Sequence, residues 1–151
     1  MVTIVIPVFN EEESLEPLYK ELILSVPSLD KSYEIIFVDD GSKDKSLNIL
    51  KEFSSKNKNI KIFSFRKNQG KSEALTYGFE KAKGNRIVTL DADLQDKPDQ
   101  VLELIKKLES GFDLVCGWRK NRKDSFGHVA FSKIFNFLLK RATRIVSHTG
   151  E

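Results

Sequence analysis

The sequence has a single cysteine among 151 residues, so no internal disulfide can form and a disulfide-stabilised scaffold is excluded. Two histidines, far apart in the chain, do not complete a zinc cluster with that cysteine. No run approaches the roughly 18 apolar residues of a spanning helix, and Met1–Asn10 lacks the basic start of a signal peptide. None of the eight glycines forms a G-x-G pair, which excludes the dinucleotide-binding fingerprint. We therefore expect a cytosolic domain of another class.

The balance of residue types is that of one folded domain. Hydrophobic residues make up 40% of the chain and charged residues 31%, which is too apolar for a disordered protein. The net charge is +3, but the segment from Arg119 to Arg144 alone carries +7, so the rest of the chain carries −4. The sequence therefore predicts that a basic surface for an anionic partner is local and C-terminal.

Apolar runs alternate with segments of helical spacing. Five runs rich in Ile, Val and Phe predict strands at Val2–Pro7, Tyr33–Val38, Ile60–Phe65, Arg86–Leu90 and Asp113–Cys116. Amphipathic helices are expected between them, with Asn10 and Ser42 capping the first two and Pro98 near the start of the fourth. This alternation predicts an α/β fold, a mostly parallel sheet with helices on both faces.

Polar side chains gather at one edge of the predicted sheet, where the strands end. The clusters after the five strands are Asn10-Glu11, Asp39–Ser42, Arg66–Lys71, Asp91–Asp96 and Trp118-Arg119. The loops at the opposite edge read as plain turns. Because ligands of parallel α/β sheets bind at the carboxyl ends of the strands, the sequence predicts a ligand site at this edge.

Asp91 and Asp93 are the sharpest signal in this set. They leave the apolar run Ile87–Leu90 two positions apart, so both carboxylates are expected to face the same side and to repel each other. A divalent cation bound by one or two carboxylates and by substrate phosphates relieves that repulsion. The alternative is that both residues only form the next turn, where Asp is common.

The other two loops are less specific. Asp39 and Asp40 precede a Gly-Ser turn, and beyond forming the turn one of them could accept hydrogen bonds from a base or a ribose. Gly70-Lys71-Ser72 resembles the end of a P-loop, but Phe65 stands where that motif needs a glycine, so an NTPase is excluded. Lys71 and Arg66 can still approach a nucleotide at the start of a helix.

The C-terminal basic segment has two parts. Arg119, Lys120, Arg122 and Lys123 form a cluster suited to phosphate groups. From Phe131 to Ile145 apolar residues recur at helical spacing, with basic residues off the apolar stripe. Such a helix either lies at a membrane surface or packs on the core with a solvated face, and both interpretations stay open.

Four motifs resemble glycosyltransferase family 2, in order and in spacing. They are Ile4–Glu11, Val38–Ser42, Arg66–Lys71 and Asp91–Gln95. The resemblance covers residues 2 to 123 and is strongest to the polyprenyl-phosphate glycosyltransferases. It implies a GT-A (Rossmann-like) fold, a UDP- or GDP-hexose donor, Mg²⁺ or Mn²⁺, and inversion at the anomeric carbon. It also implies two parts: a nucleotide-sugar-binding core, 1–123, and a basic helical segment, 124–151, at the start of the acceptor- or membrane-facing region.

The resemblance implies a role for each matching residue. The donor would contact Pro7, Phe9, Glu11, Asp39, Asp40, Lys71, Asp91 and Ala92, with Asp40 on the base and Asp39 supporting its loop. The metal would be held by Asp91, Asp93 and Gln95, and the catalytic residues would be Asp93, Gln95 and Arg119. The acceptor phosphate would face Arg119 and Arg122.

A lipid phosphate is already an anion and needs no strong general base, whereas a hydroxyl acceptor does. The Asp93-Leu94-Gln95 sequence and the basic C-terminal helix favour a polyprenyl-phosphate acceptor. We also expect a location in the cytoplasm at the inner face of the cell membrane and no nucleic acid partner; a homo-oligomer stays open. Family members continue beyond the region of Ser147–Glu151, so the C-terminal part of the family domain is expected to be missing and transfer by this chain alone to be weak or absent. Three alternatives remain: transfer to a saccharide hydroxyl, a non-catalytic nucleotide-sugar-binding module, and a phosphate-accepting signalling domain.

Overall fold

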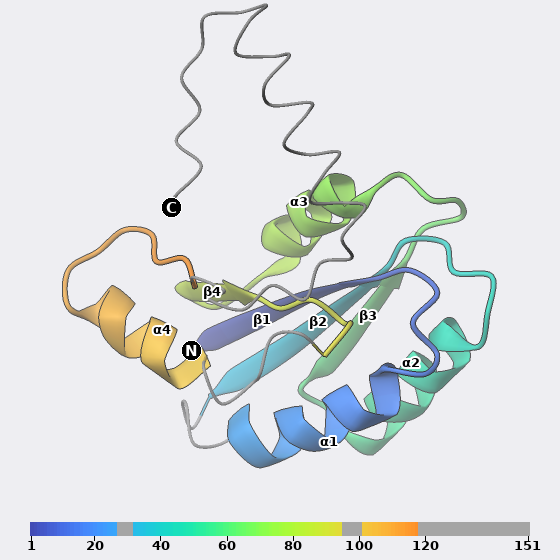
Figure 1. Cartoon of the computed structure of the whole chain (residues 1–151), viewed down its shortest axis with the longest axis horizontal. Helices are drawn as coiled ribbons and strands as arrows, with labels where there is room; N and C mark the ends of the chain where they lie inside the picture. The colour runs from blue at the N-terminus through green and yellow to red at the C-terminus, as the bar shows by residue number, and fades with distance from the viewer. Residues whose placement is uncertain (27–31, 95–100, 118–151) are drawn as a thin grey trace, which may run out of the picture. The chain divides into compact units, whose positions relative to one another are not determined.

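The computed structural model describes residues 1–26, 32–94 and 101–117. Strands and helices alternate along this part of the chain (Figure 1). Its strands are β1 (Val2–Val8), β2 (Tyr33–Asp39), β3 (Ile60–Ser64) and β4 (Arg86–Thr89). Its helices are α1 (Leu15–Ser25), α2 (Ser46–Lys56), α3 (Lys71–Lys81) and α4 (Val101–Glu109). The α/β fold predicted from the alternation of apolar runs is confirmed.

The described strands form one parallel sheet in the order β3-β2-β1-β4. After β1 the chain adds β2 and β3 on one side and then crosses back to place β4 on the other side of β1. The direction of winding therefore reverses between β1 and β4. In open parallel sheets this reversal opens a crevice outside the carboxyl ends of the two strands, which is where ligands bind.

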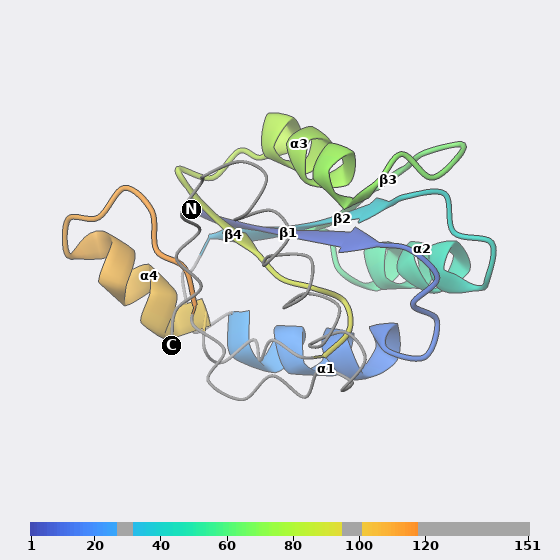
Figure 2. The same ribbon diagram turned by 45° about the horizontal axis from the view of Figure 1, so that its top comes forward.

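Side chains of β1 and β2 point alternately to the two faces of the sheet. Ile4, Ile6 and Phe37 face the larger core, which α1, α2 and α4 cover. Ile36 and Val38 face a smaller core, which α3 covers. Figure 2 shows α3 on one side of the sheet and the other helices on the opposite side. Because both faces are covered, these strands are almost continuously apolar rather than alternating.

Helix α3 approaches the sheet at a glycine. A Cβ atom at Gly78 would lie 2.3 Å from Cγ1 of Val5, closer than carbon atoms can pack. The missing side chain therefore lets the helix backbone settle onto β1, which fixes the position of the start of α3 relative to the strand ends.

Three local predictions were wrong. Asp113–Cys116 form no strand, and Leu114 within this segment is 79% exposed. An apolar run becomes a strand only where a neighbouring strand pairs with its backbone. Helix α1 begins after Ser14 rather than Asn10, whose backbone turns to a φ of 55° and whose Oδ1 accepts a hydrogen bond from the Lys43 N–H. Ser42 does not cap α2, which begins only at Ser46.

Other predictions fall outside the described residues: the helix start near Pro98, the boundary between 1–123 and 124–151, and the C-terminal amphipathic helix. Met1–Cys116 form one compact unit. Among the helices within the described ranges, none is long and apolar enough to cross a membrane.

Candidate functional site

A pocket lies at the carboxyl edge of the sheet, where the winding reverses. Segments from the ends of β1, β2 and β4 and from the start of α3 line it. The lining residues are Pro7, Val8, Phe9, Glu11, Asp40, Asn68, Lys71, Asp91, Ala92 and Asp93. Four loops that are distant in sequence thus meet at the place where the topology predicts a ligand.

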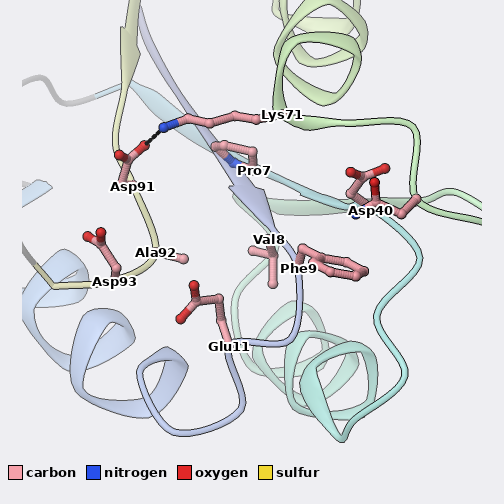
Figure 3. Close-up of a pocket in the computed structure, with 10 residues that line it drawn as sticks. Pro7, Val8, Phe9, Glu11, Asp40, Lys71, Asp91, Ala92 and Asp93 are labelled. Atoms are coloured by element: carbon pink, nitrogen blue, oxygen red, sulfur yellow. Dashed lines mark hydrogen bonds and ion pairs between the residues drawn. The ribbon is translucent and has the colours of Figure 1, made fainter. Parts of the chain in front are cut away.

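The two ends of the pocket differ in chemistry. In Figure 3 the carboxylates of Asp91, Asp93 and Glu11 lie at one end, whereas Phe9 and Asp40 lie at the other. Phe9 is 42% exposed, although it directly follows a strand that is almost entirely buried. An exposed aromatic ring beside a carboxylate can stack on a flat base and accept hydrogen bonds from its N–H groups. The opposite end suits a cation bound to phosphate.

Asp91 is partly buried at the anionic end and carries an ion pair. Its Oδ1 lies 2.6 Å from Nζ of Lys71, and the two side chains are 27% and 58% exposed. The lysine reaches across the pocket from the start of α3, as Figure 3 shows. The pair therefore joins the end of β4 to the start of α3 across the opening of the pocket.

The carboxylates of Asp91 and Asp93 suit a divalent cation. Carboxylate oxygens are the ligands that Mg²⁺ and Mn²⁺ prefer. Among the residues that the structure describes, no group of three or more His, Cys, Asp or Glu side chains is arranged to hold a metal ion. Two carboxylates leave most of an octahedral shell to water and to ligand phosphates, which is the usual way Mg²⁺ is bound in nucleotide sites. The residues present therefore fit a cation that arrives with a diphosphate.

Asp40 fastens the loop before α3 to the end of β2. Its carboxylate is 3% exposed and accepts hydrogen bonds from the N–H groups of Gln69 at 2.7 Å and Gly70 at 2.9 Å. Each carboxylate oxygen has a second lone pair, so Asp40 can still accept a bond from a ligand. Asp40 thus positions the loop that carries Asn68 and Lys71.

Asp39 is buried behind Asp40 and does not line the pocket. One of its oxygens accepts from the Ser42 N–H at 3.1 Å and the other from the Ser64 hydroxyl at 2.7 Å. These bonds hold the turn after β2 against the end of β3. Asp39 is thus not among the residues that line the pocket, and the supporting role that the resemblance implied for it stays a prediction.

The loops after β1 and β2 are joined by reciprocal hydrogen bonds. Asn10 N–H donates to the Ser42 hydroxyl at 3.0 Å, and the Lys45 N–H donates to the Glu12 carboxylate at 2.9 Å. The Glu12 N–H in turn donates to Asp44 at 3.1 Å. These bonds hold the first loop on both sides of the pocket-lining Glu11, whose carboxylate also accepts a hydrogen bond from the Ser14 hydroxyl at 2.7 Å.

Asp44 and Ser46 are the inner part of this connection. Desolvation alone would raise the pKa of Asp44, but hydrogen bonds from Ser46 and from the Glu12 N–H outweigh it and lower the pKa below its ordinary value of 3.8. The carboxylate is thus held in its charged form. Ser46, fully buried, uses its hydroxyl oxygen to accept a bond from the Glu11 N–H at 2.8 Å.

The structure brings together most of the residues that the sequence predicted for the site. Those that line the pocket are Pro7, Phe9, Glu11, Asp40, Lys71, Asp91, Ala92 and Asp93. Gln95, Arg119 and Arg122 lie outside the described residues, so the structure does not place them. The roles assigned to all these residues stay predictions.

Sequence reasoning missed two lining residues, Val8 and Asn68. Val8 is 1% exposed and has the same apolar character as the strand before it, so no signal distinguishes it. Asn68 lies inside the polar run between β3 and α3, next to Gln69, and both side-chain amides can donate and accept hydrogen bonds, so residue type alone does not distinguish Asn68.

The sequence itself decides the family. Residues 3–150 match the sequence profile of the family described as Glycosyl transferase family 2. The chain belongs to this family. The prediction of family 2 is thereby confirmed at that level; the polyprenyl-phosphate branch is not distinguished by the match.

Solved structures with the same fold include glycosyltransferases. The mannosyltransferase PcManGT from Pyrobaculum calidifontis, in complex with GDP-Man and Mn²⁺, is similar with a TM-score of 0.65 and 24% identity over 78% of this chain and 35% of that chain. S. aureus TarS has a TM-score of 0.61 and 20% identity over 72% of this chain and 19% of that chain. TarS 1–349 in complex with UDP-GlcNAc has a TM-score of 0.56 and 18% identity, over 82% and 38%. These likenesses confirm the GT-A fold, and this chain spans well under half of each of these proteins.

Proposed function

We propose that this chain binds a nucleoside diphosphate sugar together with a divalent cation, as the donor-binding part of an inverting glycosyltransferase. The observation that carries the proposal is the pocket itself. It joins an aromatic end to an end with two carboxylates, at the one place in the sheet where parallel α/β folds bind ligands. The GDP-Man, UDP-GlcNAc and Mn²⁺ named for the structures of similar fold support the same ligand class.

The residues would divide the donor between them. Phe9 would stack on the base, and Asp40 would accept an N–H from the edge of the base. Asp91 and Asp93 would hold the cation through carboxylate oxygens, and Lys71 would donate to the diphosphate. The bound cation would stabilise the negative charge that develops on the leaving diphosphate.

Transfer breaks the bond between the anomeric carbon and the diphosphate oxygen. The acceptor oxygen forms the new bond from the opposite face of the sugar, so the configuration inverts and the nucleoside diphosphate leaves with the electron pair. The chain's part in this step would be to hold the diphosphate in place at the anionic end of the pocket, where charges that are already positioned stabilise the leaving group. In this proposal Asp93, which lines the pocket, would lie near the sugar and the acceptor.

The proposed acceptor is a polyprenyl phosphate, and its support comes from sequence. Arg119 and Arg122 would bind the acceptor phosphate, and Gln95 would join Asp93 beside the cation. The chain would be cytoplasmic, with its basic segment 124–151 bound to the inner face of the cell membrane. Transfer to a saccharide hydroxyl is the alternative, and it would require a general base near the pocket.

Calorimetric titration tests the donor site. UDP and GDP would be titrated into this chain with and without Mn²⁺, and into Asp93→Asn, with Glu52→Gln as a control carboxylate on the exposed surface of α2. We expect one nucleotide to bind with Mn²⁺, Asp93→Asn to lose that binding, and Glu52→Gln to retain it. Binding that is unchanged by Mn²⁺ and by Asp93→Asn would contradict the proposal.

Radiolabelled sugar transfer tests the acceptor. The chain, and a version extended at its C-terminus, would be incubated with a radiolabelled sugar donor that carries the nucleotide found to bind. The acceptor would be either a polyprenyl phosphate or a free saccharide. Label in the lipid phase that is lost in Arg119→Ala would support the lipid acceptor. Label in the saccharide alone would favour the alternative, and metal-dependent binding without any transfer or hydrolysis would identify a non-catalytic module.

A further inference from the structure

The ion pair between Lys71 and Asp91 contributes little to the fold. Lys71 is more than half exposed, and exposed ion pairs stabilise proteins by only about 0–1 kcal/mol. A second exposed pair, Lys56–Glu52, lies within one helix turn and separates its charges by 3.9 Å. The Lys71–Asp91 pair instead joins the start of α3 to the end of β4, with Nζ and Oδ1 2.6 Å apart, and both residues line the pocket. Its place therefore relates it to the ligand rather than to stability.

The backbone of Lys71 is fixed, whereas its side chain can move. Lys71 is the first residue of α3 and directly follows Gly70, whose φ of 101° is a glycine conformation and whose N–H is bonded to Asp40. The side chain beyond it is a flexible four-carbon stem that ends in a compact charge with three donors. A change of partner at the ammonium group therefore needs no movement of the helix.

The positive charge of Lys71 should oppose the binding of a cation and favour the binding of a diphosphate. With Lys71 in place, the formal charge of Lys71, Asp91 and Asp93 together is −1, whereas it would be −2 without the lysine. A divalent cation that arrives alone must displace the ammonium group from Asp91 or bind beside it, and like charges repel. A diphosphate gives the ammonium group another anionic partner across the pocket. The carboxylate of Asp91 then becomes available to bind the cation.

We propose that Lys71 is an internal counter-ion for Asp91 that leaves this carboxylate for the phosphates of the arriving nucleotide. Lys71 is then a positioning residue that couples the two ligands: it weakens cation binding to the empty pocket and strengthens binding of the cation and the diphosphate together. This rests on the proposed donor site. It assigns Lys71 a role in the order in which the ligands bind, beyond contact with the donor.

Mn²⁺ binding measured by electron paramagnetic resonance tests the proposal without any turnover. The dissociation constant of Mn²⁺ would be measured for the unmodified chain and for Lys71→Met, with no nucleotide and with saturating UDP or GDP. Lys56→Met is the matched control, because Lys56 is also ion-paired and has a similar exposure of 60%. Lys71→Arg keeps the charge and is expected to behave like the unmodified chain.

Without nucleotide we expect Lys71→Met to bind Mn²⁺ about fivefold more tightly than the unmodified chain, as expected for removing one partly solvated charge. With nucleotide this advantage should disappear or reverse, and Lys56→Met should match the unmodified chain in both conditions. Equal Mn²⁺ affinity for Lys71→Met and the unmodified chain without nucleotide would overturn the counter-ion role. If no variant binds either nucleotide, the proposed donor site and the coupling are wrong together, whereas the Mn²⁺ measurement alone still decides whether Lys71 opposes the cation.

Discussion

The buried hydroxyl of Ser46 accepts a hydrogen bond from the backbone N–H of Glu11 at 2.8 Å, across 35 positions of sequence. Ser46 is the first residue of α2 and has no contact with the pocket, whereas Glu11 lines it. The helix start thus holds one wall of the pocket. Such a bond is directional, so it fixes the backbone of Glu11 more closely than apolar packing would.

Replacing Ser46 with Ala should weaken nucleotide binding as well as stability. The change leaves the Glu11 N–H without its partner, which costs about 1–2 kcal/mol, and it releases the loop that carries Phe9. We expect the nucleotide dissociation constant to rise about fivefold, which corresponds to about 1 kcal/mol. Ser54→Ala on the same helix removes a hydroxyl that bonds only to the carbonyl of Lys51, so it should leave the dissociation constant unchanged. Equal effects of the two substitutions in a calorimetric titration would be evidence against this role.

Replacing Gly41 with Ala should be more damaging than the same change at Gly111. Both glycines have a positive φ, 72° and 108°. A Cβ at Gly41 would lie 2.7 Å from the backbone carbonyl carbon of Lys67, whereas a Cβ at Gly111 meets nothing within 4 Å. We expect a loss of about 1–2 kcal/mol at Gly111 from the left-handed conformation alone, and about 3 kcal/mol at Gly41, where a backbone clash is added. Urea unfolding of the two variants measures this difference, and a smaller loss at Gly41 than at Gly111 would contradict the close approach.

The buried carboxylate of Glu34 should make stability depend on acid pH. Glu34 accepts hydrogen bonds from the Thr3 hydroxyl at 2.7 Å and from the Lys83 N–H at 2.6 Å, and it pairs with Lys61. Burial alone would raise its pKa, but Lys61, the Lys83 N–H and Thr3 together lower it below the ordinary value of 4.5. Because the folded pKa is the lower one, the stabilisation is present above about pH 4.5 and is lost as the pH falls through the folded pKa.

Glu34→Gln should remove this dependence. We expect the variant to be less stable at neutral pH by about 2 kcal/mol, because Lys61, which is one-third exposed, loses its charged partner. The variant should also lose less stability on acidification than the unmodified chain. Urea unfolding between about pH 3 and pH 7 measures both effects. Glu52→Gln, which changes an exposed pair, serves as the control. A pH profile that Glu34→Gln leaves unaltered would show that another group is responsible.

The sequence was a good guide wherever one physical requirement acted alone. Strands covered on both faces must be apolar throughout, so Val2–Val8 and Tyr33–Asp39 could be located almost to the residue. Carboxyl ends of parallel strands meet at one edge, so Asp40, Asp91 and Asp93 could be expected in one place before any coordinates.

The sequence was a poor guide where two loops decide the structure together. Asn10 and Ser42 are good capping residues, but each is used by the other's loop: the Asn10 N–H donates to Ser42, and Asn10 accepts from Lys43. Local preference cannot reveal such partners, because they are more than thirty positions apart. The apolar run Asp113–Cys116 failed for a similar reason, since a strand depends on a neighbour that its own sequence does not specify.

The measurement that tests the donor site most directly is anomalous X-ray scattering from Mn²⁺ in crystals grown with UDP or GDP. We predict one strong peak about 2.1 Å from carboxylate oxygens of both Asp91 and Asp93, with the diphosphate bound to the same ion and the base against Phe9. A Mn²⁺ peak away from this pair, or a nucleotide bound elsewhere with no metal at Asp91 and Asp93, would contradict the account.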